Sequence, residues 1–405
     1  MHCNKILIVA EVFSENLGDG VIFNSLKNRI LKNYPNAKID KVDLSGNLDW
    51  QEYSSSLNNK QLVSNKKNSV IQFIKKINII KKCYYAYNWY ALTRPKCLPH
   101  WKEKIKQADH IVIGGGQLLT DSNFGFPPKI FDIYLLCKKY NKPISIIGCG
   151  VNKHWGIIAK LLYTRVINYC TSISVRDSVS KSRVLTYTGK DVCCHPDLGF
   201  TIQSLDNKTN QKENYPKLSA CKKSLYINFQ PLEDFKFFVP SLSSFTEEQY
   251  LNFWEHLINR CKEKYNISLI TNGHPSDYNV ISKLYNQLKK NGHNDISVLP
   301  RATRPSELID QIKQCDCIIS TRMHAGIIAY SLGKKVLPIS WDDKVNNVWF
   351  EMVGNNTFVL APSIFRKEIT LSEIDDLFNN AQIEQEKNLE EAIIKIDQHI
   401  NSVFL

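Results

Sequence analysis

An arginine and a histidine, separated by one residue, follow a short apolar segment in the C-terminal half of the sequence. Cys317–Ser320 has the length of a buried strand, and Arg322 and His324 come directly after it. A guanidinium can grip a phosphate or a carboxylate through two parallel hydrogen bonds, and an imidazole can move a proton near neutral pH. The pattern therefore predicts a site that binds an anionic substrate and transfers a proton. The alternative for a lone Arg-x-His is an ordinary solvated loop.

The segments around this pair predict how it is positioned. Small and apolar residues at helical spacing follow His324 and end at Gly333, where a left-handed glycine can close a helix. Residues 336–339 then predict the next strand. Parallel sheets bind ligands at the carboxyl ends of their strands, where the following helix also offers free N–H groups to an anion. Arg322, Met323 and His324 would lie at such an end.

Four loops in the N-terminal half also follow predicted strands and carry glycines or polar residues. They contain Asn16, Gly18 and Asp19; Gly114, Gly115, Gly116 and Gln117; Lys153 and His154; and Arg176. Glycines let a ligand or another segment of backbone approach closely. We predict substrate contacts at these positions. The alternatives are plain close crossings at the glycines, and an ordinary pairing of Arg176 with Asp177 or with the sheet edge.

Strands alternate with helices in both halves of the chain, which is typical of α/β proteins with doubly wound sheets. A length of 405 residues exceeds one ordinary core and indicates two domains. Residues 204–223 are polar and are the best linker, so we expect domains of residues 1–215 and 216–405. The tail predicts two helices, about 371–380 and 383–402, the first capped by Ser372 with Asp375 three residues on.

The composition indicates a soluble globular protein, with 43% hydrophobic and 22% charged residues. The net charge of +13 favours an anionic partner: a phosphorylated small molecule, a membrane surface or nucleic acid. Nucleic acid is the weakest of these, since no recognised binding motif occurs. No metal is expected, because no metal-binding motif stands at a strand end.

The cysteines indicate the compartment. Twelve are present, none is in a CxxC pair, and many lie in apolar runs. These are Cys137, Cys149, Cys170, Cys315 and Cys317. Buried, reduced thiols of a cytoplasmic protein explain this pattern best.

A basic and aromatic segment, residues 60–95, suggests a second kind of contact. Apolar residues from Val70 to Tyr84 recur at helical spacing beside several lysines, and further aromatic residues follow. A basic amphipathic helix with an aromatic edge can lie on an anionic membrane surface. Peripheral contact with the inner face of the cell membrane is one hypothesis. The alternative is a helix packed on its domain with its lysines in water.

Five motifs, taken in order, resemble those of the polysaccharide pyruvyl transferase family. They are Asn16–Asp19, Gly114–Gly116, Ser174–Ser178, Ser320–Ala325 and Trp341–Lys344. The likeness spans residues 6 to about 348, and its most specific part is the Arg-x-His segment with the lysine that follows. Two positions depart from the family pattern: Gly20 replaces a frequent acidic residue, and Met323 replaces the usual leucine.

The resemblance implies a GT-B-like fold, in which two Rossmann-like domains face each other across a cleft. It implies transfer of the enolpyruvyl group of phosphoenolpyruvate onto two hydroxyls of a sugar, giving a pyruvate ketal in cell-surface polysaccharide biosynthesis. Arg322 would hold the acidic groups of the donor and His324 would transfer the proton, with Arg176 and Lys344 as further anion contacts. No cofactor is implied beyond phosphoenolpyruvate as donor substrate. The sugar acceptor, lipid-linked or nucleotide-linked, would bind on the N-terminal domain.

Two other functions remain as alternatives. A sugar-nucleotide-dependent glycosyltransferase of the same architecture would bind a diphosphate near Arg322 and Lys344. A non-catalytic scaffold on a membrane surface would use the basic and aromatic segment. Such a scaffold has no need for arginine, histidine and glycine at the strand ends of both halves, which argues against it.

Overall fold

The computed structural model of the protein describes residues 4–50, 78–202 and 222–404. By its internal contacts the chain divides into two compact units. Unit 1 comprises Met1–Ser14, Ile22–Leu198 and Ile394–Leu405, and unit 2 comprises Glu15–Val21 and Gly199–Ile393. The domain boundary expected at 215/216 lies outside the described residues, as do residues 60–77 of the basic and aromatic segment.

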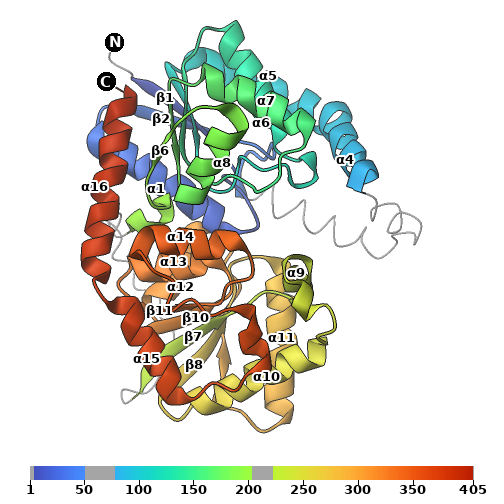
Figure 1. The fold of residues 1–405 in the computed structure, drawn as a ribbon, viewed down its shortest axis with the longest axis vertical. Helices are drawn as coiled ribbons and strands as arrows, with labels where there is room; N and C mark the ends of the chain where they lie inside the picture. The colour runs from blue at the N-terminus through green and yellow to red at the C-terminus, as the bar shows by residue number, and fades with distance from the viewer. Residues whose placement is uncertain (1–3, 51–77, 203–221, 405) are drawn as a thin grey trace. The chain divides into compact units, whose positions relative to one another are not determined.

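Unit 1 is built on a parallel sheet of six strands in the order β2-β1-β3-β4-β5-β6. Figure 1 labels three of these strands, β1, β2 and β6. Its strands are β1 (Lys5–Ala10), β2 (Lys38–Asp43), β3 (His110–Gly114), β4 (Ile144–Cys149), β5 (Ser172–Val175) and β6 (Cys193–Cys194). Its helices are α1 (Leu17–Asn33, whose first turn belongs to unit 2), α4 (Asn78–Tyr87), η1 (Asn88–Thr93), α5 (Arg94–Gln107), η2 (Ser122–Phe124), α6 (Pro127–Lys139), α7 (Ile157–Tyr169) and α8 (Ser178–Thr188).

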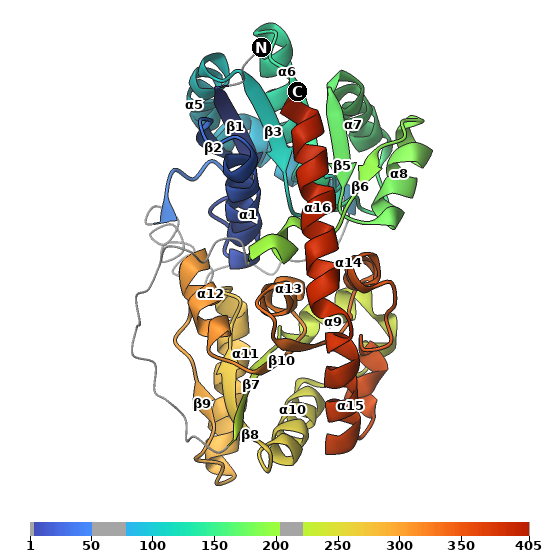
Figure 2. The same cartoon turned by 90° about the vertical axis from the view of Figure 1, so that its left-hand side faces the viewer.

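The sheet of unit 1 is covered on both faces. Along β1, Leu7 and Val9 pack into the core under α5, α6 and α7, whereas Ile6 and Ile8 pack into the core under α1. The second core also receives apolar residues of the C-terminal helix α16, and Figure 2 shows α1 and the end of α16 on this face. Successive strand residues point to opposite faces, so a strand buried on both sides needs a nearly continuous apolar run. The sequence of β1 has that run.

Unit 2 is built on a parallel sheet of five strands in the order β11-β10-β7-β8-β9. Its strands are β7 (Lys223–Asn228), β8 (Tyr265–Ile270), β9 (Ser297–Val298), β10 (Cys317–Ser320) and β11 (Lys335–Pro338). Its helices are α9 (Leu232–Phe238), η4 (Pro240–Leu242), α10 (Glu247–Cys261), α11 (Pro275–Lys290), α12 (Pro305–Lys313), α13 (Met323–Ser331), α14 (Asp343–Val353), η5 (Pro362–Arg366) and α15 (Leu371–Gln382), and α16 (Gln385–Phe404) begins here and ends in unit 1.

The strand order of unit 2 identifies where a ligand would bind. Read from the other edge, the order is β9-β8-β7-β10-β11, which is 3-2-1-4-5 when the strands are numbered by their order in this unit. The chain starts at the central strand β7, adds β8 and β9 on one side, and then adds β10 and β11 on the other side. The direction in which strands are added therefore switches between β7 and β10. Open α/β sheets bind ligands beyond the carboxyl ends of the two strands at such a switch point. Here those ends are Asn228 and Ser320, and the Ser320 hydroxyl donates to Asn228 Oδ1 at 3.0 Å.

Several local expectations can be compared with the structure. Helix α13 follows β10 as predicted, all nine of its residues are buried, and Gly333 closes it at a φ of +72°. The five cysteines expected in the core are buried and free. Both tail helices are present, as α15 and α16. The predicted cap of α15 is wrong, because Thr370 caps that helix in a capping box with Glu373. The helix therefore begins at Leu371, and the Thr370 hydroxyl takes one of its first free N–H groups.

Candidate active site

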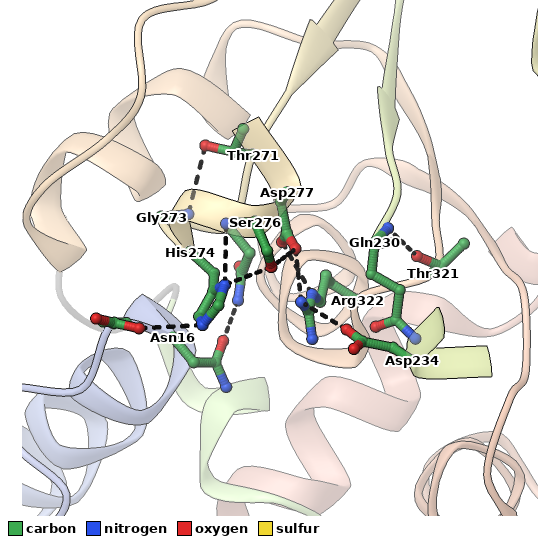
Figure 3. A network of polar contacts seen from close by, with 12 residues as sticks. Asn16, Gln230, Asp234, Thr271, Gly273, His274, Ser276, Asp277, Thr321 and Arg322 are labelled. Carbon is green, nitrogen blue, oxygen red and sulfur yellow. Dashed lines mark hydrogen bonds and ion pairs between the residues drawn. The ribbon is translucent and has the colours of Figure 1, made fainter. Parts of the chain in front are cut away.

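Arg322 lies between two carboxylates at the end of β10 (Figure 3). Its Nε and Nη2 donate to the two carboxylate oxygens of Asp277, at 2.9 and 2.5 Å, in a two-bond fork. Nη2 also lies 3.3 Å from Asp234 Oδ2. The Asp277 side chain is fully buried in the first turn of α11, whereas that of Asp234, on α9, is 43% exposed. Asp277 therefore fixes the plane of the guanidinium, and Asp234 makes the weaker, more accessible contact.

The charges of this cluster shift the pKa values of its members. Burial lowers the pKa of Arg322, but Asp277 and Asp234 more than offset this, so the guanidinium remains a cation. Partial burial raises the pKa of Asp234, and the charge of Asp277 raises it further, whereas Arg322 lowers it by less than these together. One cation and two carboxylates leave the cluster negative when all are ionised. Asp234 therefore gains a proton more easily than an ordinary aspartate.

His324 is packed against the first turn of α1. It is 8% exposed, and its Nδ1 lies 3.5 Å from Asn16 Nδ2, a long and weak contact. A Cβ atom at Gly18 would lie 2.3 Å from His324 Cβ and from Nδ1. Gly18 was predicted to allow a close approach, and in the structure the group that approaches is the imidazole. The absence of a side chain at position 18 therefore sets where His324 sits.

The loop after β8 ties the same turn of α1 in place. The Asn272 carbonyl accepts from Leu17 N at 3.2 Å, and the Asn272 side chain donates to the Asn16 side-chain oxygen. The next polar residue, His274, caps α11: its Nδ1 accepts from Ser276 N, and its Nε2 lies 3.0 Å from Glu15 Oε2. These bonds hold Asn16 beside the imidazole of His324. Asn16 also contacts Asp19 at 3.3 Å, so two of the predicted polar residues orient each other.

Gln230 adds an unusual buried amide to this end of the sheet. It follows β7, where its backbone N donates to Thr321 Oγ1 at 3.0 Å (Figure 3). The residue is fully buried, and neither polar atom of its side chain has a hydrogen-bond partner among the described residues. A buried amide without partners is costly, and a bound ligand is one of the explanations that such a group calls for.

Lys344 is linked to the loop that carries Arg322 by the side chain of Trp341, which contacts both. Its Nζ lies 4.2 Å from the centre of the Trp341 ring, and Trp341 Nε1 donates to the Thr321 carbonyl at 2.7 Å. A cation held over a tryptophan face is stabilised there.

Met323 is 7% exposed and starts α13 as part of the core. Five residues predicted from the sequence, on α1, α13 and α14 or directly before them, thus accompany Arg322 and His324 in unit 2. They are Asn16, Gly18, Asp19, Met323 and Lys344.

The glycine-rich end of β3 belongs to unit 1, and its neighbours are side chains of α1. A Cβ at Gly114 would lie 2.1 Å from Leu26 Cδ2, and one at Gly115 would lie 2.1 Å from Ile22 Cγ2. Gly115 and Gly116 also have φ values of +73° and +67°. Close packing of α1 on the sheet thus accounts for the first two glycines, and positive φ values account for the second and third. Substrate contact by these glycines and by Gln117 stays a prediction.

Arg176 is a buried ion-pair partner in unit 1. It is 1% exposed, and its Nη1 donates to Asp197 Oδ2 at 3.1 Å. A Cβ at Gly150 would lie 2.7 Å from Arg176 Nε, so this glycine makes room for the guanidinium. Lys153 and His154 are exposed between β4 and α7. Contacts of these three side chains with substrate stay predictions.

The residues that sequence reasoning did not single out come from the other strand ends of unit 2. They are Gln230, Asp234, Asn272, His274 and Asp277. Asn272 and His274 follow β8 directly, and polar residues just after a buried strand were a usable signal. Asp277 lies in the first turn of α11, where an acidic residue is common and does not by itself mark a site. Only the strand order shows that the loops after β7, β8 and β10 lie together.

The arrangement can bind an anion and exchange a proton. Nη1 of Arg322 makes no hydrogen bond to the described residues. A phosphate or carboxylate could bind to Nη1, or could replace Asp234 as the partner of Nη2. Asp277 keeps the guanidinium in a fixed orientation, as electrostatic catalysis requires. The imidazole of His324 and the carboxyl group of Asp234 can hold or donate protons. No group of three or more metal-ligating side chains is gathered within the described ranges.

Two solved structures share this architecture. The co-structure of MnaA of S. aureus with UDP has a TM-score of 0.50 and 12% identity, covering 96% of this chain and 90% of that one. A structure assigned as a UDP-N-acetylglucosamine 2-epimerase of Listeria monocytogenes has a TM-score of 0.50 and 12% identity, covering 98% and 91%. At this identity the likeness shows the fold alone. The chain has the two parallel α/β domains of the GT-B-like class.

Within that class the chain belongs to the polysaccharide pyruvyl transferase family. The sequence model of this family matches residues 16–343, which include Asn16, Arg322 and His324. The amylovoran biosynthesis protein AmsJ of Erwinia amylovora is 22% identical over 362 residues, and the match covers 84% of each chain. The resemblance drawn from the five motifs is confirmed.

Proposed function

We propose that this protein transfers the enolpyruvyl group of phosphoenolpyruvate onto two hydroxyls of a sugar, forming a cyclic pyruvate ketal during cell-surface polysaccharide biosynthesis. Membership of the polysaccharide pyruvyl transferase family supports the reaction class. The similarity to AmsJ, an amylovoran biosynthesis protein, supports a role in polysaccharide assembly. The donor and the ketal product are the parts that this proposal adds.

The reaction requires one proton donor and a fixed cation. Protonation of the methylene carbon of the donor gives a methyl group and an oxocarbenium-like centre at the neighbouring carbon. One sugar hydroxyl attacks that centre and loses its proton. The C–O bond to phosphate then breaks, which regenerates an oxocarbenium-like centre on the same carbon. A second sugar hydroxyl attacks this centre and loses its proton, which closes the ring, and inorganic phosphate is released. The donor carries a phosphate and a carboxylate, so a positioned cation must offset their charge.

The observation that carries the proposal is the position of Arg322 and His324 at the switch point of unit 2. Arg322 would bind the donor through its Nη1 edge, with the fork to Asp277 holding its plane. His324 would protonate the methylene carbon, because it follows Arg322 by two residues at the start of α13. Asn16 holds its imidazole in place. Gln230 would donate to the carboxylate or phosphate, which would satisfy its buried amide.

The test is incubation with labelled phosphoenolpyruvate and a panel of acceptor sugars. The expected result is phosphate release coupled to an acceptor mass gain of one pyruvate less one water. The same assay in the presence of a chelator tests the expectation that the reaction needs no metal ion, and unchanged turnover is the expected result. Phosphate release without a modified sugar in any acceptor would contradict the ketal product.

A sugar-nucleotide-dependent glycosyltransferase is the second candidate, since the similar MnaA structure holds UDP. Thermal-shift measurements separate the two candidates. Stabilisation by phosphoenolpyruvate supports the pyruvyl transferase, and stabilisation by nucleotide sugars alone supports the glycosyltransferase. Stabilisation by both would fit a nucleotide-linked acceptor.

Replacing His324 by alanine tests the proton-transfer role. General acid catalysis by one side chain is worth roughly 10²–10⁴-fold, so the turnover rate of His324→Ala should fall by about two orders of magnitude or more. The variant should still fold, with a melting temperature lowered by the cavity that a buried imidazole leaves, so a cooperative melting transition is the control. Turnover within a few-fold of the parent protein would refute the assignment.

A further inference from the structure

An apolar surface on unit 1 has no role in the site described above. A cavity of about 460 Å³ opens between α4 and the start of α7, and its accessible lining is almost wholly apolar. Cys83 and Ala86 line it from α4, and Ile157 and Ile158 line it from α7. We call these residues, together with Tyr87 and Leu161, the α4–α7 patch.

The patch is exposed beyond the cavity itself. Ile157 is 81% exposed, Ile158 62%, and Leu161, one turn further along α7, 53%. On α4, Tyr87 is 64% exposed and lies one turn after Cys83, on the face that lines the cavity. Contiguous exposed apolar groups of this kind mark contact sites for a protein or a membrane.

The charges around the patch are positive. The acidic residue among those lining the cavity is Asp121, which is buried and neutralised by Lys82 at 2.7 Å and by the Gly156 N–H. The exposed Lys153 and Lys160 flank Ile157 and Ile158, and no aspartate or glutamate occurs between residues 133 and 176. This composition complements an anionic surface.

We propose that the α4–α7 patch docks unit 1 onto an anionic lipid bilayer. Apolar groups with tyrosine and lysine at their margin are the composition of segments that lie in a membrane interface. Ile157, Ile158 and Leu161 insert among the acyl chains, Tyr87 lies at headgroup level, and the two lysines face the lipid phosphates. No described helix is both long and apolar enough to cross the bilayer.

Vesicle flotation tests the proposal with the full-length protein. Vesicles containing phosphatidylglycerol should bind the protein. Vesicles of phosphatidylcholine alone should bind it at least about tenfold more weakly. Binding should weaken further as salt is raised, because the lysine contribution is screened. Absence of binding to phosphatidylglycerol vesicles would overturn the proposal.

Variants locate the contact. The double variant Ile157→Ser/Ile158→Ser should bind vesicles more weakly by about tenfold or more, given the apolar area that two isoleucines bury. Lys160→Gln should cost about fivefold. The matched control is Leu185→Ser on α8, also in unit 1 and 47% exposed, which should bind as the parent does. All of these positions are exposed, so unchanged melting temperatures are expected.

Two other occupants of the patch give different results. If a second copy of the chain covers it, the double isoleucine variant dissociates a dimer in light scattering and vesicle binding does not change. If residues 51–77 of the same chain cover it, the double variant lowers the melting temperature and leaves vesicle binding intact. Either outcome overturns the membrane proposal.

Discussion

At the scale of single residues, the central feature of the site is that its arginine is already bonded. Nε and Nη2 of Arg322 both donate to Asp277, and Nη2 also contacts Asp234. An incoming anion therefore meets a cation whose position is fixed and whose charge is partly offset. Asp277 serves orientation, whereas Asp234, the more exposed carboxylate, opposes a second negative charge.

Removing the charge of Asp234 should therefore strengthen donor binding. A carboxylate near a bound anion in a half-exposed site costs on the order of 1 kcal/mol, or about fivefold in affinity. Asp234→Asn should lower KM for phosphoenolpyruvate by about that factor in steady-state assays, and the turnover rate should stay within a few-fold of the parent. If turnover instead drops by about two orders of magnitude, Asp234, whose pKa is raised, is a proton donor in the reaction.

Position 18 offers a test of His324 that leaves the imidazole in place. Gly18→Ala introduces a Cβ 2.3 Å from His324 Cβ, so either the imidazole or the first turn of α1 must move. A displacement of about 1 Å at a reacting group can slow a reaction by about 100-fold, and we expect turnover to fall by a similar factor. The matched control is Gly125→Ala, where the nearest atom is Ser122 O at 3.5 Å and the backbone is α-helical. Equal activity of the two variants would contradict a positioning role for Gly18.

The sequence was sufficient to single out Arg322 and His324 and insufficient to find their partners. A charged pair directly after a buried strand is a local pattern, so it can be read without a fold. Asp277 and Gln230 matter because the loops after β8 and β7 meet the loop after β10, and that meeting depends on strand order. Gly18 was recognised as a point of close approach, but the group that approaches it, His324, lies far away in the sequence.

At the scale of elements, the prediction of type was easier than the prediction of ends. Helix α13 and its glycine stop follow from a run of small and apolar residues that a buried helix needs. The cap of α15 was assigned to the wrong residue, although the helix begins at about residue 371 as predicted, because two capping pairs, Thr370 with Glu373 and Ser372 with Asp375, overlap in the sequence. The structure uses the first pair, in which each side chain bonds to the backbone of the other residue.

The end of α16 depends on one buried ion pair in unit 1. Arg29 of α1 has no exposed side-chain surface and donates through both Nε and Nη2 to Asp397. Asp397→Ala leaves that guanidinium buried without its counter-charge, which typically costs about 3–5 kcal/mol. Urea denaturation should show this loss in the free energy of unfolding.

The matched control for this prediction is Asp191→Ala. Asp191 pairs with Lys181 on the surface of the same unit, and both side chains are well exposed. Surface pairs contribute about 0–1 kcal/mol, so the control should unfold close to the parent. A similar, small effect of both variants would mean that α16 is held to unit 1 by its apolar contacts, such as those of Ile396 and Ile400.

At the scale of the whole chain, alternation of strands and helices predicted two doubly wound domains, and the structure and the comparisons confirm that class. The alternation could not predict how the chain divides. Unit 1 takes its last residues from the C-terminus, Ile394–Leu405, and unit 2 takes Glu15–Val21 from near the N-terminus. These exchanges depend on packing between segments that are far apart in sequence, which no local pattern encodes.

The same return of the C-terminus gives unit 1 two buried histidines and thus a sensitivity to acid. Burial lowers the pKa of His110 to about 4, and burial together with the nearby His195 lowers the pKa of His399 to about 4. In the unfolded chain each imidazole takes up a proton near its ordinary pKa of about 6.5. Between about pH 6.5 and pH 4 the unfolded state therefore binds more protons, and the free energy of unfolding falls as the pH falls.

For each histidine this loss amounts to about 2 kcal/mol between about pH 7 and pH 5. Urea titrations at the two pH values measure it, and His399→Leu isolates one contribution from that of the carboxylates. The variant should lose about 2 kcal/mol less than the parent over this range, because leucine fills a similar buried volume and binds no proton. If parent and variant lose the same free energy of unfolding, His399 takes up its proton while the protein stays folded. The end of α16 would then open locally and expose the imidazole to water.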